Sequence, residues 1–212
     1  MNAGPRPAAP RLYVFASAAS HAAGDLAEAL QTVTAAAVLL PLGDADEPAM
    51  IEQVKRIAAG LQDAGAALLL DGRPEIAART GADGAHLSGP DALKAALPLL
   101  KPGRIAGAGR LHSRHDAMVA GEAGADYVMF GEPDASGHCP SLGAVIDRVA
   151  WWAELFEIPC VAYAARLDDI EELAAAGADF IAVGDALFDD PRGVRTAAVD
   201  AAMRLKIMEP AG

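Results

Sequence analysis

The phrase Gly-Ala-Asp occurs three times in this chain, at 81–83, 124–126 and 177–179, and a weaker copy stands at Gly65-Ala66-Ala67. Each copy closes an Ala-rich stretch with helical spacing and opens a short apolar run. Glycine ends a helix at low cost because it adopts the left-handed conformation, and the Ala-Asp pair then turns the chain into a strand. The repeat therefore predicts a chain that passes from helix to strand several times in the same way.

Short apolar runs alternate with helical segments along the whole chain. The expected strands are Leu12–Ala16, Ala37–Pro41, Ala67–Leu70, Gly84–Leu87, Arg104–Ala108, Tyr127–Phe130, Pro159–Tyr163 and Phe180–Val183. The expected helices between them include Ala49–Ala64, Ser113–Ala123, Leu142–Phe156 and Asp168–Ala176. Such alternation gives a parallel sheet covered by helices. Eight strands in 212 residues predict an α/β protein that forms a single (β/α)8 TIM barrel.

Composition and charge indicate the bounds of this barrel, the partners that it does not bind and its location. We expect the barrel to span residues 11–208, after a Pro/Ala tail over 1–10 that we predict to be disordered. A net charge of −12 with only 17 Lys and Arg argues against binding to nucleic acid or to anionic membranes. The tail lacks the apolar centre of a secretory signal and no apolar run is long enough to span a bilayer, which predicts a cytoplasmic protein. Cys139 and Cys160 are expected to be free thiols.

In such barrels the chemistry lies where strands end, so polar residues after each strand are the candidates for a site. The tract Asp71-Gly72-Arg73, followed by Gly81–Leu87 and Asp91, resembles the thiamine phosphate synthase/TenI family. The segments Gly124–Gly131 and Pro159–Ala162 extend the resemblance over nearly the whole chain. The resemblance implies a transferase of thiamine biosynthesis that joins a pyrimidine diphosphate to a thiazole phosphate with Mg²⁺. In the TenI branch it implies an isomerase of the thiazole phosphate tautomer.

Several positions depart from the family pattern. The Gln, Arg and Lys of the synthase's second strand align with Val38, Leu40 and Leu42, and one Mg²⁺ carboxylate aligns with Gly72. The other metal carboxylate is present as Asp91, and Asp71 could compensate from the next position. The resemblance thus implies Asp71 and Asp91 as the metal-binding candidates.

The phosphate-binding side of the pattern is also altered. The strand-six loop keeps a hydroxyl at Ser136 but lacks the lysine, and Ala164-Ala165 replaces a Gly-Gly pair. Gly184-Asp185 follows the last strand, where a carboxylate repels a phosphate. In the TenI branch the histidine after the strand-six glycine is the acid/base, and Glu132 stands there in this chain.

These residues define the predicted site. Glu132 and His112 are the predicted catalytic residues. The predicted ligand-binding residues are Arg73, Arg110, Ser88, Ser136, Gly184 and Asp185. Arg73 is equally suited to pair with Asp71 or Glu75, and Arg110 to pair with Glu132 or Asp134.

Other motifs have structural interpretations. The acidic run 44–47 precedes a helix with Pro48 in its first turn, which favours a role at the helix dipole over a metal site. Ser88 and Asp91 are available for capping a helix. Trp151 and Trp152 are expected on a helix outside the barrel, where they pack against a neighbouring helix or a second subunit, and we favour a contact in a homo-oligomer.

The sequence therefore predicts a divergent barrel of thiamine metabolism that binds or converts a small anionic or heterocyclic ligand. One alternative is an active, Mg²⁺-dependent thiamine phosphate synthase. The other is a binding or regulatory barrel without catalysis. Fold analogy does not choose among them.

Overall fold

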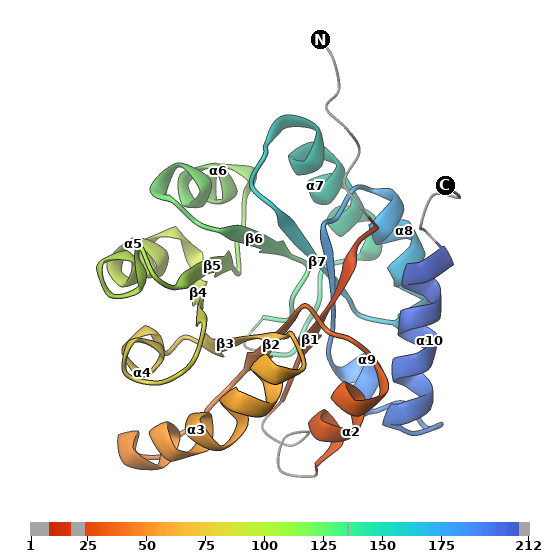
Figure 1. Cartoon of the computed structure of the whole chain (residues 1–212). Helices are drawn as coiled ribbons and strands as arrows, with labels where there is room; N and C mark the ends of the chain where they lie inside the picture. The colour runs from red at the N-terminus through yellow and green to blue at the C-terminus, as the bar shows by residue number, and fades with distance from the viewer. Residues whose placement is uncertain (1–8, 18–23, 135, 208–212) are drawn as a thin grey trace.

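Eight parallel strands close into a barrel in the computed structural model, which describes residues 9–17, 24–134 and 136–207. Each strand pairs with the next in sequence, and the last pairs with the first (Figure 1). The strands are β1 (Arg11–Phe15), β2 (Ala37–Leu40), β3 (Ala67–Asp71), β4 (Gly84–Ser88), β5 (Ile105–Gly109), β6 (Tyr127–Phe130), β7 (Cys160–Ala164) and β8 (Phe180–Val183). The prediction of a single eight-stranded barrel is confirmed, and each predicted strand lies within one residue of its observed bounds.

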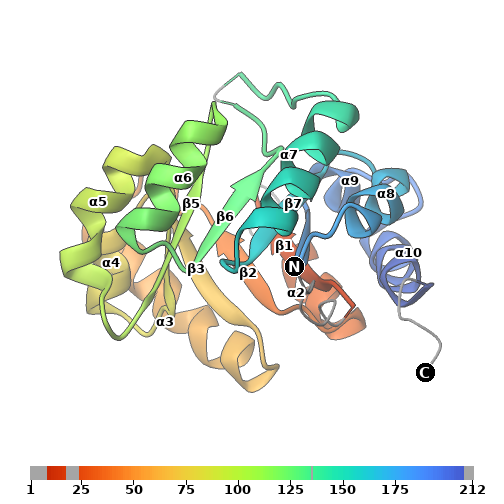
Figure 2. The same cartoon turned by 90° about the horizontal axis from the view of Figure 1, so that it is seen from above.

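Helices surround the strands (Figure 1). They are α2 (Asp25–Thr32), α3 (Glu47–Asp63), α4 (Pro74–Arg79), α5 (Gly89–Leu100), α6 (Arg114–Ala123), α7 (Leu142–Leu155), η1 (Leu167–Asp169), α8 (Ile170–Ala175), α9 (Asp185–Phe188) and α10 (Val194–Ile207). Helices α8, α9 and α10 lie together on one side of the barrel (Figure 2). In the part of the chain that the structure describes, none of the helices combines the length and the apolar character needed to cross a membrane. Most of the predicted tail, residues 1–8, lies outside the described residues.

Local signals place several helix starts. Asp46 caps α3 by accepting a hydrogen bond from the Ala49 amide at 2.9 Å, so the acidic run serves the helix start as predicted. Ser113 and Asp116 form a capping box at the start of α6. Ser88 is the N-cap residue of α5, but its side chain makes no capping hydrogen bond there.

The repeated aspartate ties neighbouring strands together. The carboxylates of Asp83, Asp126 and Asp179 accept hydrogen bonds from the backbone amides of Leu68, Ala106 and Cys160 at 2.8, 2.7 and 2.8 Å. Each amide lies at the start of the strand before the one that the repeat opens. The aspartates of the repeat therefore fix the register of three strand pairs at the amino-terminal end of the barrel.

The glycines of the repeat differ in conformation. Gly124 and Gly177 have φ values of 105° and 103°, in the left-handed region that ends a helix. The expectation of this conformation at Gly81 is wrong, because α4 has already ended at Thr80 with extended backbone.

Two apolar layers meet at the strands. The outer layer packs strands against helices and includes Val38, Leu40 and Leu42, while Leu39 belongs to the inner layer that fills the barrel. The three residues aligned with the family's Gln, Arg and Lys, namely Val38, Leu40 and Leu42, therefore face the helices and not the barrel interior. Leu39 points inward instead, and it is also apolar, so β2 offers the interior no cation.

The tryptophan pair of α7 is split between core and surface. Trp152 is fully buried and donates its indole N–H to the Ile158 carbonyl at 2.7 Å. Trp151 is half-buried, with the Arg114 guanidinium 4.9 Å from its ring centroid. The favoured oligomer contact is wrong for Trp152, which is a core residue between strands and helices.

Candidate functional site

The buried side chains of Tyr13, Tyr127 and His86 form a row across the barrel interior, called the polar file below. The hydroxyl groups of Tyr13 on β1 and Tyr127 on β6 lie 3.0 Å apart, and the Tyr127 hydroxyl lies 2.8 Å from Nδ1 of His86 on β4. The His86 and Tyr127 rings stack with their centroids 5.7 Å apart. Burial raises the pKa of both tyrosines well above the usual range, so both keep their hydroxyl protons.

Glu132 lies at the end of this file, just after β6. Its carboxylate is buried, Oε1 lies 3.5 Å from His86 Nε2, and Oε1 also accepts a hydrogen bond from the Arg110 amide. Among the described residues, His86 and Glu132 therefore form a buried pair of acid–base groups inside the barrel.

Two glycines on β5 make room for this file. A Cβ at Gly109 would stand 2.0 Å from Glu132 Oε1 and 2.2 Å from His86 Nε2. A Cβ at Gly107 would stand 2.1 Å from the Tyr127 ring. Strand β5 therefore lacks side chains where the polar file passes, a use of glycine that allows close approach.

Arg110 places a cation at the mouth of the barrel. Its backbone has φ 49°, the left-handed region that a residue other than glycine seldom adopts. The guanidinium donates to Ser88 Oγ on β4 and lies 3.5 Å from Asp71 Oδ2 on β3. The predicted ion pair of the Arg110 guanidinium with Glu132 or Asp134 is wrong. Its partner is Asp71, and only the Arg110 amide contacts Glu132.

The resemblance implies a bound Mg²⁺, which requires carboxylate oxygens that are placed to coordinate it. Asp71 turns one oxygen toward Arg110 and buries the other, Oδ1, without a hydrogen-bond partner within the described part of the chain. Asp91 is exposed in the first turn of α5. Residues 9–17, 24–134 and 136–207 contain no group of three His, Cys, Asp or Glu side chains placed to hold a metal. Mg²⁺ needs several oxygen ligands, and a guanidinium competes for Asp71, so these side chains do not fit an ion held by the protein alone.

Two predicted site residues support loops. Arg73 donates to the Gly43 carbonyl at 3.1 Å, which links the loops after β3 and β2, and neither expected partner, Asp71 nor Glu75, is its contact among the described residues. His112 is exposed, and its carbonyl accepts a hydrogen bond from Arg148 at 2.8 Å. The histidine beside Glu132 is therefore His86, whereas the predicted catalytic His112 is exposed.

The strand-six loop is stabilised by its own aspartate. Asp134 accepts hydrogen bonds from the Ser136 amide and hydroxyl at 2.8 and 2.6 Å and from the His138 amide at 3.0 Å. These bonds lower the pKa of Asp134. Asp134 and Ser136 thus form a turn. Half-burial and the nearby Asp185 raise the pKa of Cys139, which disfavours a thiolate nucleophile.

The side of the barrel after β7 and β8 is dominated by paired charges. Gly184 and Asp185 lie beside Tyr163, whose hydroxyl accepts a hydrogen bond from the Asp185 backbone. An adjacent cleft of about 600 Å³ is lined by residues 165–168, 185–186, 189–192, 200 and 204.

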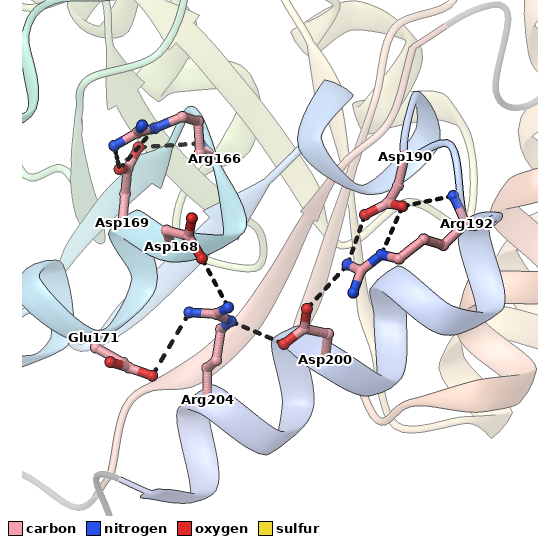
Figure 3. A network of polar contacts seen from close by, with 8 residues as sticks. All are labelled: Arg166, Asp168, Asp169, Glu171, Asp190, Arg192, Asp200 and Arg204. Carbon is pink, nitrogen blue, oxygen red and sulfur yellow. Dashed lines mark hydrogen bonds and ion pairs between the residues drawn. The ribbon is translucent and has the colours of Figure 1, made fainter.

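Each arginine of this cleft is held by carboxylates (Figure 3). Arg204 contacts Asp168, Glu171 and Asp200. Arg192 contacts Asp190 and Asp200, and Arg166 contacts Asp169. Because these cations already have anionic partners, an incoming phosphate would have to compete with carboxylates in this cleft.

Neither His86 nor the two tyrosines were predicted as site residues from the sequence. A signal for His86 was present, since it stands two residues before Ser88 in a strand, and residues at that spacing share a face. Tyr13 and Tyr127 had no comparable signal, because an aromatic residue in an apolar strand is most simply explained as core.

Comparison with known proteins places the chain in a family. The family model described as thiamine monophosphate synthase matches residues 12–187. The thiamine-phosphate synthase of Rhodospirillum centenum is 38% identical over 82% of this chain and 86% of its own length. That of Hyphomonas neptunium is 36% identical over 71% and 70%.

Solved structures agree with this placement. A thiamine phosphate pyrophosphorylase from Pyrococcus furiosus superposes with a TM-score of 0.79 at 25% identity and covers 93% of this chain and 96% of its own. The chain therefore belongs to the thiamine monophosphate synthase/TenI family.

Proposed function

We propose that this barrel binds a small anionic heterocycle of thiamine metabolism and catalyses proton transfer on it, with Glu132 as the acid/base. The observation that carries the proposal is the buried carboxylate of Glu132 beside His86. Both contacts of this carboxylate use Oε1, so Oε2 is the oxygen left to exchange a proton with a ligand. A carboxylate held in place and shielded from water is suited to general acid–base catalysis.

Arg110 supplies the positive charge that an anionic ligand requires. Its ion pair with Asp71 spans 3.5 Å, and the Arg110 side chain is 35% exposed. A guanidinium carries five N–H donors, so Arg110 can bind an incoming phosphate or carboxylate without leaving Asp71. The bidentate guanidinium suits both groups.

The first test is thermal unfolding in the presence of thiazole phosphate, thiamine phosphate, or the pyrimidine diphosphate with and without Mg²⁺. A ligand at a hundredfold excess over its dissociation constant stabilises by about 2.7 kcal/mol, which raises Tm by about 5–10 °C in a domain of this size. We expect thiazole phosphate to produce this shift and Arg110→Gln to abolish it. If thiazole phosphate gives no shift, the proposed ligand class is wrong.

Turnover is tested separately from binding. With thiazole phosphate in deuterated water, proton transfer at a carbon leads to deuterium incorporation or tautomer exchange that NMR detects. Saturable binding without exchange would refute catalysis by Glu132 and would support the alternative of a binding barrel without catalysis.

A second candidate function is the synthase reaction itself. The similarity to the Rhodospirillum centenum synthase over most of both chains favours it. In this candidate Arg73 and Arg110 would meet the diphosphate, and Mg²⁺ would arrive with the diphosphate near Asp71 and Asp91. Magnesium-dependent formation of thiamine phosphate from the two precursors would establish it. Its absence, together with deuterium exchange, would favour the first proposal.

We further propose a cytoplasmic homo-oligomer whose barrel spans residues 11–208. The half-buried Trp151 and the exposed Leu155 on α7 support an oligomer contact at this helix. Light scattering of the wild type and of Leu155→Glu tests this proposal, and a monomeric wild type would refute it.

A further inference from the structure

His86 presents an unusual buried ring nitrogen. The side chain is 2% exposed, Nδ1 is engaged by Tyr127, and Nε2 makes no hydrogen bond within the described part of the chain. The nitrogen that carries the proton follows from what the neighbouring groups can donate and accept. A buried polar atom without a partner costs free energy, so the arrangement of protons around it matters.

Two arrangements run both hydrogen bonds in one direction along these side chains. Both keep their hydroxyl protons, because burial raises the pKa of each. In the first arrangement Tyr13 donates to Tyr127 and Tyr127 donates to Nδ1 of His86, so the His86 proton is on Nε2. In the second, Nδ1–H donates to Tyr127 and Tyr127 donates to Tyr13.

The second arrangement leaves two groups unsatisfied. Tyr13 is 2% exposed, and its hydroxyl contact among the described residues is Tyr127, so its own proton would have no acceptor. The Nε2 lone pair would then face the Glu132 carboxylate at 3.5 Å, where two electron-rich atoms repel. The first arrangement uses both hydroxyl protons and turns an N–H toward the carboxylate.

We propose that Tyr127, supported by Tyr13, is a positioning residue that fixes His86 in the tautomer with its proton on Nε2. This N–H points toward Glu132 in the space that Gly109 keeps open. A donor at this point lies beside the Glu132 carboxylate and is available to an acceptor on the ligand. The tautomer assignment is independent of the proposed function, whereas its use in catalysis rests on that function.

Nitrogen NMR of the full chain labelled with ¹⁵N-histidine tests the tautomer without any ligand. The His86 signals are identified by their loss in His86→Gln. We expect a protonated Nε2 and an unprotonated Nδ1 in the wild type. A wild-type spectrum with the proton on Nδ1 overturns the inference.

Two phenylalanine variants provide a matched pair. Tyr127→Phe removes the donor to Nδ1, so the His86 signals should change to those of a mixture of tautomers. Tyr13→Phe removes a hydroxyl from the same file but leaves that donor, so the Nε2–H signals should persist. Unchanged signals in Tyr127→Phe would refute the role of Tyr127.

Turnover adds a second measurement. Deuterium exchange on thiazole phosphate should fall at least tenfold in kcat in Tyr127→Phe, with KM changed by less than threefold, and should fall by less in Tyr13→Phe. Equal losses in the two variants would refute a specific positioning role. A confirmed tautomer in a protein that turns over no ligand would refute the proposed function and leave the assignment of His86 intact.

Discussion

Gly109 is the residue at which a side chain would most disturb the candidate site. We predict that Gly109→Ala displaces Glu132 and His86, because the added Cβ would stand 2.0 and 2.2 Å from their polar atoms. Overpacking of this kind costs about 1–3 kcal/mol and should also weaken ligand binding. Urea unfolding and the thermal shift with thiazole phosphate measure the two effects.

Gly103→Ala is the matched control for this change. Gly103 is exposed, and a Cβ there would meet nothing within 4 Å. Equal loss of stability in the two variants would contradict the steric role assigned to Gly109.

Glu132→Gln separates catalysis from binding at the same site. The amide retains the size and one oxygen of the side chain but cannot accept a proton as a base. We expect kcat for deuterium exchange to fall about 10²–10⁴-fold, the usual range for loss of a general acid–base group. Isothermal titration should show ligand affinity within threefold of the wild type. Glu154→Gln, an exposed change on α7, is the control, and indifference of the exchange rate to Glu132→Gln would refute the catalytic role.

At the scale of the elements, the repeated aspartates hold strand starts in register. We predict that Asp179→Ala lowers the free energy of unfolding by about 1–3 kcal/mol, because the Cys160 amide loses its carboxylate partner at the start of a buried strand. Asp179→Asn keeps an acceptor oxygen and should lose less than half as much. Chemical denaturation of both variants measures the difference, and equal losses would show that charge, rather than the hydrogen bond, carries the effect.

At the scale of the whole molecule, the ion pairs around α10 make stability sensitive to acid. Hydrogen bonds from Arg192 lower the pKa of Asp190 to about 2 and also lower that of Asp200. A depressed carboxyl pKa contributes stability that is fully present above the unfolded value, near pH 4, and is lost as the pH falls through the folded value. We therefore expect Tm to decline between pH 4 and pH 2.

Arg192→Gln tests the origin of this decline. Without the guanidinium, both carboxyl groups should titrate nearer their ordinary range, so this variant should have a lower Tm at pH 6 and a shallower decline below pH 4. Thermal melts from pH 6 to pH 2 measure both curves. Parallel curves for the two proteins would show that other groups control unfolding in acid.

The sequence by itself determined the elements and their order. Glycine-terminated helices, apolar runs of strand length and the repeated Gly-Ala-Asp phrase are local features, and local propensity and periodicity are sufficient to locate them. The same features predicted the barrel, since alternating strands and helices have few other ways to cover both faces of a parallel sheet. They also brought Glu132 and Arg110 into the predicted site, because both follow strand ends.

Only the tertiary structure decided which side chains meet. Strands covered on both faces are apolar throughout, so nothing in β2 distinguished the inward Leu39 from the outward Val38 and Leu40. The partner of Glu132 was equally hidden, since His86 lies on a different strand and the nearer His112 is exposed. Closing the sheet into a barrel sets β4 and β6 on either side of β5, and the missing side chain of Gly109 lets His86 and Glu132 approach each other. That approach depends on distance through space, which a linear pattern of residues does not encode.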